Sequence, residues 1–317
     1  MNDEPLVRAS GVSFAYGTRA VLDGLDLELR AGEVFGIVGS DGAGKSALLK
    51  VLIGQLSPAS GTVTVLGLPA TDLRLRSRIA YMPQAFGQYP DLSVAENLQF
   101  FADLHGLDRA TARALIADLL GRTGLAEFAG RRAGNLSGGM MQKLALACAL
   151  VSRPKVMFLD EPTTGVDPVS RRAFWQLLDQ VRAEGVGIVY ATANMDEAER
   201  CDRVGMLVRG RFARVGSPLE LVSEVEPAFF EVGGEGARAR RRDVRAMDAV
   251  KLVFPVGGTL KVWLTRPELE SAFRGAVEKL VPALRVSAQR PSLHDIALRD
   301  LALAGGNDNG TASLVRH

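Results

Sequence analysis

The sequence predicts an α/β fold built on a buried, mostly parallel sheet. Two apolar runs carry this prediction: Val34–Val38 leads into a glycine-rich loop and a helical segment, and Val156–Leu159 leads into two acidic residues. Unbroken apolar runs of this length are typical of parallel strands covered on both faces. Between residues 6 and 30, leucines alternate with charged residues, which indicates half-buried antiparallel strands. We therefore expect a parallel core sheet together with an N-terminal antiparallel region.

Composition places the chain among ordinary globular proteins. Its 317 residues, 47% hydrophobic and 23% charged, suffice for one large and one small domain. A net charge of +2 does not favour nucleic acid as a partner. The first residues are acidic, unlike a signal peptide, and no apolar run reaches the roughly 18 residues of a membrane span. Cys148 and Cys201 form no C-x-x-C pair, which favours free thiols in a cytosolic chain.

The glycine-rich loop after the first apolar run is the predicted centre of the site. Residues 39–46 match G-x-x-x-x-G-K-[ST] at every fixed position. The glycines let backbone N–H groups approach a polyphosphate, Lys45 can reach its β and γ oxygens, and the Ser46 hydroxyl is placed to bind Mg²⁺. The flanking strand and helix argue against an ordinary glycine-rich turn. The residues predicted to contact nucleotide here are Gly39, Ser40, Asp41, Gly42, Ala43, Gly44, Lys45, Ser46 and Ala47.

The acidic pair after the second apolar run is predicted to complete the site. A buried parallel strand would deliver Asp160 and Glu161 to the carboxyl edge of the sheet, beside the glycine-rich loop. There Asp160 would hold Mg²⁺ or its water, and Glu161 would polarise an attacking water. The alternative is a strand that merely ends in a charged turn, which the matched loop upstream disfavours.

The intervening segments are predicted in order. Tyr16 lies where it would reach over an adenine ring, with a simple packing contact as the alternative. Strands are expected at 61–66 and 79–82, the second leading to Gln84, and helical structure is expected over 93–128. Ser93 and Glu96 form a capping box for that region. A long apolar helix is expected to follow Ser137 through Val151.

Taken together, these residues resemble an ATP-binding cassette (ABC) ATPase, the nucleotide-binding subunit of an ABC transporter. Besides the glycine-rich loop and the acidic strand, residues 136–139 read Leu-Ser-Gly-Gly, the signature of that family. Gln84 matches its Q-loop glutamine, Tyr16 its adenine-stacking aromatic residue, and residues 164–168 its D-loop. The resemblance covers residues 5–222, and the motifs occur in the order of the family.

The resemblance implies a P-loop NTPase ABC nucleotide-binding domain, with a RecA-like core, an antiparallel β subdomain and a helical subdomain, over residues 1–222. It implies ATP and Mg²⁺ as cofactors, with Ser46, Gln84 and Asp160 on the metal and Gln84 and Glu161 as catalytic residues. Two cassettes would pair head to tail, so that Ser137, Gly138 and Gly139 complete the site of the other chain. ATP binding would close the pair and hydrolysis would reopen it.

Residues 81–98 are similar to the drug-export branch, whose permeases are of the ABC-2 type, and in the family this region lines the groove that receives the permease. We therefore expect an ABC-2-type permease as partner and a peripheral position on the cytoplasmic face of the membrane. Three departures from the family pattern stand out. Ser40-Asp41 replaces Pro-Asn, Met140 replaces glutamine, and Ala193 occupies the position of the switch histidine, three residues before Asp196.

The missing histidine decides what kind of cassette is expected. Asn194 would replace it only through a one-residue shift that turns its side chain elsewhere. We expect a degenerate cassette, resembling the first of tandem-cassette exporters, which hydrolyses ATP slowly in its own site and acts in an asymmetric pair. A self-pairing chain with two weak sites and a nucleotide-sensing subunit that barely hydrolyses ATP are the alternatives. A cassette acting on ribosomes or DNA is disfavoured, because the sequence has neither a second cassette nor a long insertion.

Residues 223–304 predict a small α+β module without evident chemistry. Its arginine-rich run, 233–245, favours a solvated loop, with binding of acidic lipid as the alternative. Apolar runs at 251–256 and 260–264 flank a Gly-Gly turn and predict a hairpin. A helix over 267–281, a strand over 284–288 and a last helix capped by Ser292 and Asp295 follow. Residues 305–317 are expected to form a disordered tail.

Overall fold

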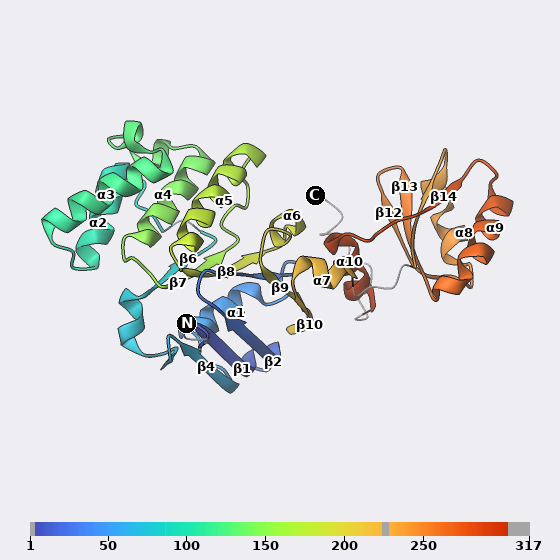
Figure 1. The fold of residues 1–317 in the computed structure, drawn as a ribbon, viewed down its shortest axis with the longest axis horizontal. Coiled ribbons are helices and arrows are strands. Elements are labelled where there is room, and N and C mark those ends of the chain that lie inside the picture. Colours follow the sequence, from blue (N-terminus) through green and yellow to red (C-terminus); the bar gives the residue numbers. More distant parts are fainter. Residues whose placement is uncertain (1–3, 86, 224–227, 304–317) are drawn as a thin grey trace. The chain divides into compact units, whose positions relative to one another are not determined.

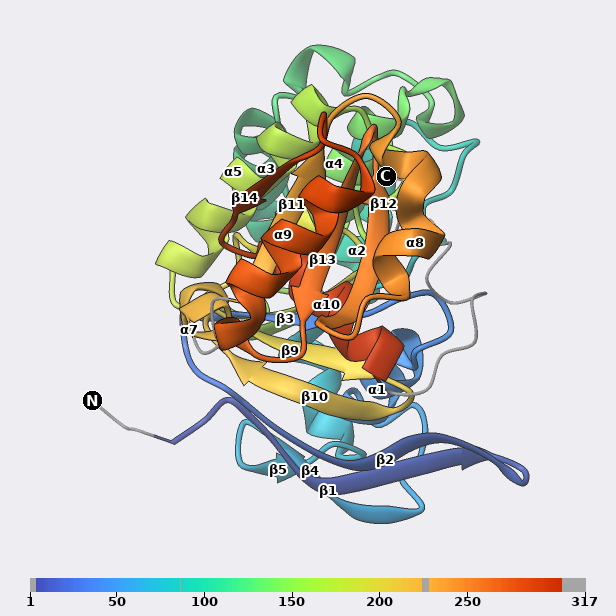
Figure 2. The same cartoon turned by 90° about the vertical axis from the view of Figure 1, so that its right-hand side faces the viewer.

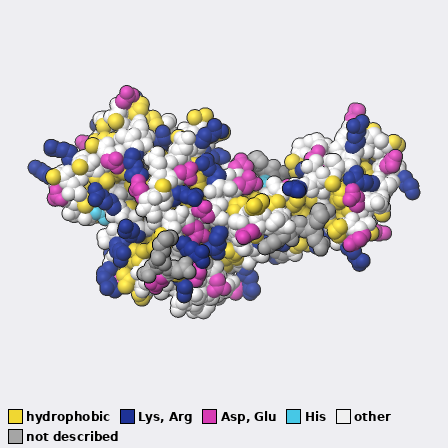
Figure 3. All heavy atoms as spheres, in the orientation of Figure 1, with side chains coloured by type: hydrophobic (Ala, Val, Ile, Leu, Met, Phe, Trp, Pro, Cys, Tyr) yellow, Lys and Arg dark blue, Asp and Glu magenta, His cyan; other side chains and the backbone are white. Residues whose placement is uncertain are grey.

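The computed structural model describes residues 4–85, 87–223 and 228–303. The chain divides into two compact units, Met1–Val215 and Gly216–His317 (Figure 1). Within the described residues, no helix is long and apolar enough to cross a bilayer. On the face drawn in Figure 3, Lys and Arg side chains are interspersed with Asp and Glu, as suits a net charge of +2.

The first unit is organised around a six-stranded sheet in the order β10-β9-β3-β8-β7-β6. Strand β3 pairs in parallel with β8 and β9, and β7 pairs in parallel with β6 and β8. Every residue of β3 and β7 is buried, which explains their unbroken apolar runs and confirms both predicted strands. The strands are β3 (Val34–Val38), β6 (Ile79–Met82), β7 (Val156–Asp160), β8 (Gly187–Thr192), β9 (Arg203–Val208) and β10 (Arg211–Gly216).

A second, antiparallel sheet has the order β2-β1-β4-β5. Its strands are β1 (Val7–Tyr16), β2 (Arg19–Leu29), β4 (Ser60–Val65) and β5 (Leu68–Pro69). Leu25, Leu27 and Leu29 of β2 are buried while the charged residues between them are exposed, so the alternating pattern is confirmed. Helix α1 (Lys45–Leu52) packs on both sheets, because its Leu48, Leu49 and Leu52 belong to one core cluster with residues of both.

A group of helices lies on the side of this unit opposite β1, β2 and β4 (Figure 1). Helices α2 (Val94–Leu104), α3 (Arg109–Thr123) and α4 (Gly138–Leu150) share a separate apolar core. The predicted capping box is confirmed, since Ser93 and Glu96 exchange hydrogen bonds at the start of α2. Helices α5 (Pro168–Ala183) and α6 (Met195–Ala198) follow β7 and β8, and short 3-10 helices occur at η1 (Leu73–Ser77), η2 (Ala126–Phe128) and η3 (Ala133–Asn135).

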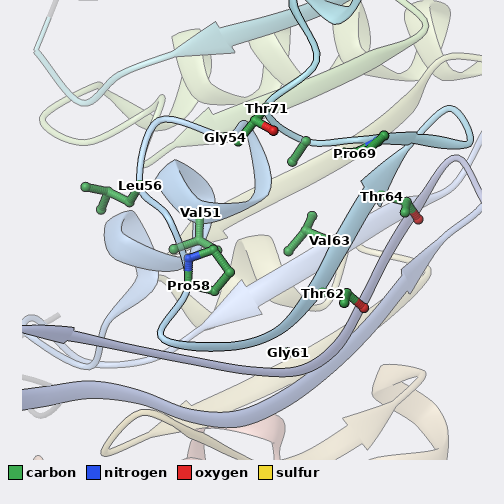
Figure 4. Close-up of a pocket in the computed structure, with 11 residues that line it drawn as sticks. Val51, Gly54, Leu56, Pro58, Gly61, Thr62, Val63, Thr64, Pro69 and Thr71 are labelled. Atoms are coloured by element: carbon green, nitrogen blue, oxygen red, sulfur yellow. The ribbon is translucent and has the colours of Figure 1, made fainter.

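One apolar hollow in the first unit lies away from the glycine-rich loop. Figure 4 shows this cavity of about 290 Å³, where Val51 and Pro58 face Val63 of β4. Its lining is mainly apolar and comes from the last turn of α1 and the β4–β5 region. Residues 39–46 meet the first turn of the same helix, so the cavity does not coincide with the predicted site.

The second unit contains a four-stranded antiparallel sheet in the order β12-β13-β11-β14. Along the chain the elements run β11-α8-β12-β13-α9-β14, the split βαβ arrangement of ferredoxin-like folds. Helices α8 and α9 cover one face of the sheet (Figure 2) and bury Val244, Phe273 and Val277 in its core. Their bounds are β11 (Phe229–Gly233), α8 (Arg241–Arg245), β12 (Val250–Val256), β13 (Thr259–Leu264), η5 (Pro267–Leu269), α9 (Glu270–Leu280) and β14 (Arg285–Ala288).

The sequence predicts most of this unit correctly and one segment wrongly. The hairpin of β12 and β13, helix α9 and strand β14 are confirmed. The arginine-rich run is not a loop, because it forms η4 (Ala237–Arg240) and α8. Two apolar side chains within the run, Ala237 and Val244, are fully buried in the sheet core and hold it there.

The remaining helices of the second unit are α7 (Pro218–Ser223) and α10 (Leu293–Leu303), which pack against each other. Ser292 and Asp295 exchange hydrogen bonds before α10, so the predicted cap is confirmed. The guanidinium of Arg299 stacks on the Trp263 ring at 4.8 Å, which brings α10 to the sheet. The predicted disordered tail, 305–317, lies outside the described residues.

Candidate active site

The glycine-rich loop leaves β3 and turns sharply into α1. Gly44, at the N-cap of α1, has φ +112°, a conformation that L side chains rarely adopt. A Cβ on Gly39 would lie 2.5 Å from the carbonyl oxygen of Leu207, so only glycine fits there. The backbone geometry therefore accounts for both glycines. It also places the first backbone N–H groups of α1 at the end of β3, an arrangement that suits an anion.

Lys45 folds back over the loop from the first position of α1. Its side chain is almost completely buried, and its ammonium donates to the carbonyl oxygens of Gly39 at 2.9 Å and Ser40 at 3.2 Å. The same ammonium lies 2.9 Å from Glu161 Oε1 and 3.8 Å from the exposed carboxylate of Asp41. A cation held in this way is positioned for the terminal phosphates of a bound nucleotide. In this structure, Glu161 supplies the negative charge beside it.

Asp160 is the last residue of β7, is buried, and accepts hydrogen bonds from two hydroxyl groups. Its side chain accepts a hydrogen bond from Ser46 Oγ at 3.0 Å on Oδ1 and from the Tyr81 hydroxyl at 3.3 Å on Oδ2. Burial raises the pKa of the Asp160 carboxyl, and the two hydrogen bonds oppose that rise. Burial and the nearby Asp160 charge raise the pKa of Tyr81, so its phenol remains a donor.

Glu161 follows Asp160 in an unusual backbone conformation. Its φ is +48°, whereas its backbone N–H still donates to Ala191 of β8 at 2.9 Å. Its Oε2 accepts from the Gln84 amide and from Thr164 Oγ1, each at 3.2 Å. A non-glycine residue at positive φ costs about 1–3 kcal/mol and persists only where the surroundings impose it. The turn brings the Glu161 carboxylate to Lys45 of the loop.

The donor set fits Mg²⁺ bound together with a nucleotide. Among the described residues, no group of three or more His, Cys, Asp or Glu side chains could hold a metal by itself. Ser46 Oγ and the Asp160 carboxylate lie together, and Mg²⁺ is commonly bound by one or two protein oxygens plus substrate phosphates and water. Gln84, the third predicted ligand, is exposed and bonded to Glu161, and its metal role stays a prediction.

Tyr16 stands at the end of β1 with 53% of its surface exposed. Its ring meets Phe14 edge-on at 4.8 Å between centroids, which fixes the ring while leaving much of it open. This geometry suits a stacking platform. Contact with adenine remains a prediction.

The signature residues lie at the start of α4. Ser137 is the N-cap, and its hydroxyl accepts from the backbone N–H of Met140 at 3.3 Å. Ser137 and Gly138 are exposed, whereas Gly139 is buried. A Cβ on Gly139 would lie 2.4 Å from Ser170 Oγ of α5, so this glycine also permits close contact between α4 and α5.

The position of the missing histidine lies just beyond β8. Ala193 offers no polar group there, and the side chain of Asn194 accepts from the backbone N–H of Asp196 at 2.9 Å as the N-cap of α6. Asn194 is therefore engaged in capping, as expected from its one-residue offset. Nothing in this segment reproduces an imidazole.

Two residues near the site were missed by the sequence reasoning. Tyr81 is the third residue before Gln84, and its bond to Asp160 forms only because β6 and β7 are neighbours. Glu197, 3% exposed, accepts from Thr163 after β7 and from Thr192 of β8, the latter at 2.6 Å. It thereby joins the segment after Glu161 to the segment around Ala193. The only sequence signal for Glu197 was its place in the Met-Asp-Glu-Ala run at residues 195–198.

Comparisons with known proteins agree with this geometry. The family described as ABC transporter matches residues 22–164. The chain is 37% identical to the probable multidrug ABC transporter ATP-binding protein YbhF of Escherichia coli K12, over 92% of the chain but 51% of YbhF. It thus spans about half the length of that relative. It is also 37% identical to the Nod factor export ATP-binding protein I of Burkholderia orbicola AU 1054, over 90% of the chain and 93% of that protein.

The fold agrees with solved cassettes. A dimeric post-hydrolysis structure of an ATP-binding cassette bound to ADP and Pi superimposes with a TM-score of 0.60 and 25% identity, covering 67% of this chain and 98% of that one. The P-loop α/β fold, the phosphate-binding loop and the long match to transporter ATP-binding proteins all indicate one conclusion. This chain belongs to the ABC transporter family.

Proposed function

We propose that this chain binds Mg-ATP at residues 39–47 and hydrolyses it slowly, as a degenerate cassette in an asymmetric exporter pair. The observation that carries the proposal is the segment after β8, where Ala193 lacks a polar side chain and Asn194 caps α6. A site that keeps its phosphate loop and acidic pair but lacks one transition-state contact should bind nucleotide well and turn it over poorly.

Each residue of the site has a distinct part in this chemistry. Lys45 and the loop N–H groups bind the β- and γ-phosphates, while Ser46 and Asp160 would hold Mg²⁺, which neutralises phosphate charge when bound. Glu161 accepts the proton of the water that attacks the γ-phosphorus, and ADP leaves. Because Glu161 lies against Lys45 in this structure, its carboxylate must move when phosphate takes that place. Gln84, bonded to Glu161, helps to orient the water.

The exposed signature supports the pairing part of the proposal. Ser137 and Gly138 face solvent at the start of α4, where a second chain can present its nucleotide to them. The positive end of the α4 dipole favours a phosphate there. This chain would therefore complete an active site on a second cassette while its own site turns over slowly. A self-pairing chain with two weak sites is the second candidate.

An exposed aromatic surface supports docking to an ABC-2-type permease at the cytoplasmic face of the membrane. Tyr89 is 46% exposed and packs edge-on against Phe100 at 4.6 Å, and Phe100 and Leu104 of α2 are also exposed. This surface lies shortly after Gln84 in the chain, so a permease seated here would lie close to a residue of the site. Anchors of this type are common in helix-in-groove contacts.

Two substitutions in this chain test the proposal, one in its own site and one in the signature that would complete the partner's site. The isolated chain should bind ATP with little turnover, and adding its partner cassette should raise the rate. In the mixture, Ser137→Arg should abolish that rise because it blocks the partner's site, whereas Glu161→Gln should change it less than about threefold. Removal of one transition-state contact commonly lowers turnover by about 10²–10³.

The measurement is phosphate release under saturating Mg-ATP, with nucleotide binding measured in parallel. Vigorous hydrolysis by the isolated chain that disappears in Glu161→Gln would contradict the asymmetric pair. Equal losses from both substitutions in the mixture would favour the self-pairing alternative.

A further inference from the structure

We propose that Tyr81 is a positioning residue for the metal, holding the Asp160 carboxylate in the orientation that presents Oδ1 to Ser46. This inference rests on the proposed function, in which Ser46 and Asp160 bind Mg²⁺. It assigns a role to a residue for which the sequence predicted no part in the chemistry of the site.

The sheet brings the phenol to the carboxylate. Strands β6 and β7 are parallel neighbours, with Tyr81 opposite Phe158 and Met82 opposite Leu159. Tyr81 therefore lies beside the last residues of β7, and its hydroxyl reaches Asp160 Oδ2 at 3.3 Å. Ser46 of α1 donates to the other oxygen, Oδ1, at 3.0 Å. Two donors from different elements thus fix the two carboxylate oxygens.

The burial of Asp160 makes the hydrogen bond from the Tyr81 hydroxyl important. Asp160 is 3% exposed, so water cannot readily replace a lost hydrogen bond. The ring of Tyr81 packs against the main core cluster, so its hydroxyl is held in place by apolar contacts that phenylalanine would keep. Without the hydroxyl, Oδ2 would be a buried acceptor lacking its donor, and the carboxylate would gain freedom to rotate away from Ser46.

Loss of the Tyr81 hydroxyl should lower the affinity for Mg²⁺ and leave the affinity for metal-free ATP unchanged. Partners that orient metal-binding groups commonly contribute about 10–100-fold to metal affinity. The Tyr81 hydroxyl donates its hydrogen bond to Asp160 and not to the loop at residues 39–45, which is proposed to hold the phosphates. Its removal should therefore weaken the part of ATP affinity that depends on Mg²⁺ and leave the metal-free part unchanged.

The test is calorimetric titration of the full chain with ATP, in EDTA and at a series of Mg²⁺ concentrations. In Tyr81→Phe, the Mg²⁺ concentration for half of the affinity gain should rise about tenfold, while the affinity in EDTA stays within twofold of wild type. Tyr190→Phe is the matched control, because it also removes a tyrosine hydroxyl from the same sheet. That hydroxyl lies 3.3 Å from Thr163 Oγ1 and should not affect the metal.

The outcomes separate this inference from the proposed function. If Mg²⁺ fails to raise ATP affinity in the wild type, both the metal site and the role of Tyr81 are overturned. If the wild type shows the gain and Tyr81→Phe keeps the same Mg²⁺ dependence, the role of Tyr81 alone is overturned. A comparable shift in Tyr190→Phe, or a loss of affinity in EDTA for Tyr81→Phe, would indicate a structural role and also overturn it.

Discussion

At the scale of single residues, the site is organised by one buried cation. The Lys45 ammonium contacts two carbonyl oxygens of its own loop and the carboxylate of Glu161, a residue that follows β7 and has φ +48°. Both side chains are largely buried, so water screens the attraction between their charges less than it does for a surface ion pair. A bound phosphate would replace one negative charge beside Lys45 with another. The lysine therefore has a partner in both states.

Lys45→Ala should abolish measurable Mg-ATP binding. It removes the charge that neutralises the terminal phosphates and leaves the Glu161 carboxylate without its cation. Calorimetry with ATP measures the effect, with Lys50→Ala as a control because Lys50 lies in the same helix but outside the loop. An affinity within a few-fold of wild type in Lys45→Ala would show that the phosphate-binding assignment is wrong.

At the scale of elements, the contact between α4 and α5 sets how the signature is presented. Gly139 is buried in the first turn of α4, where a Cβ would meet both Oγ and Cβ of Ser170 at 2.4–2.5 Å. Ser170 belongs to α5, which begins at Pro168, the last residue of the predicted D-loop. The two loops expected to face a second cassette are therefore tied together by one close approach. The signature glycine has a packing role in addition to the contact implied by the family.

Gly139→Ala should destabilise the chain by about 1–3 kcal/mol, the usual cost of overpacking. Gly138→Ala is the matched control, because a Cβ there would meet nothing within 4 Å. Urea unfolding measures both, and adding Ser170→Gly to Gly139→Ala should recover much of the loss. Equal stabilities for the two alanine variants would contradict the packing role.

At the scale of the whole molecule, the chain consists of two units with separate cores. All residues assigned to nucleotide, metal or signature contacts belong to the first unit. The second unit has its own sheet, and its helix α7 packs against α10 from the end of the described chain. Helix α7 therefore depends on residues far away in sequence. We propose residue 222, the predicted boundary, as the end of the nucleotide-binding domain only in the sense that all residues assigned to the site precede it.

A chain ending at Gly216 should fold and bind ATP like the full chain, because every nucleotide motif lies upstream. A chain ending at Ser223 should bind ATP equally well but be less soluble, because it keeps α7 with Leu221, which is 1% exposed in the full chain, and lacks α10. Thermal unfolding, solubility and ATP titration compare the three. Loss of ATP affinity in both shortened chains would show that the second unit supports the site.

Local patterns in the sequence account for many of the features that were predicted from it and are found in the structure. The strands β3 and β7, the capping residues of α2 and α10 and the glycine-rich loop all follow from neighbours within a few residues. Such features depend on backbone geometry and short-range hydrogen bonds. The prediction of a loop for the arginine-rich run was wrong because the structure of this run depends on distant contacts. Its helices are held by Ala237 and Val244 against a sheet whose strands lie elsewhere in the sequence.

The sequence by itself determined the fold class, the phosphate-binding loop, the acidic pair and the absence of a histidine at Ala193. Only the tertiary structure decided that Tyr81 meets Asp160, that Glu197 joins Thr163 to Thr192, and that Gly139 touches Ser170. These contacts depend on which strands and helices become neighbours. Residue periodicity tells which face of an element is buried, but it does not tell which partner covers that face. Strand order and helix packing supply that information in three dimensions.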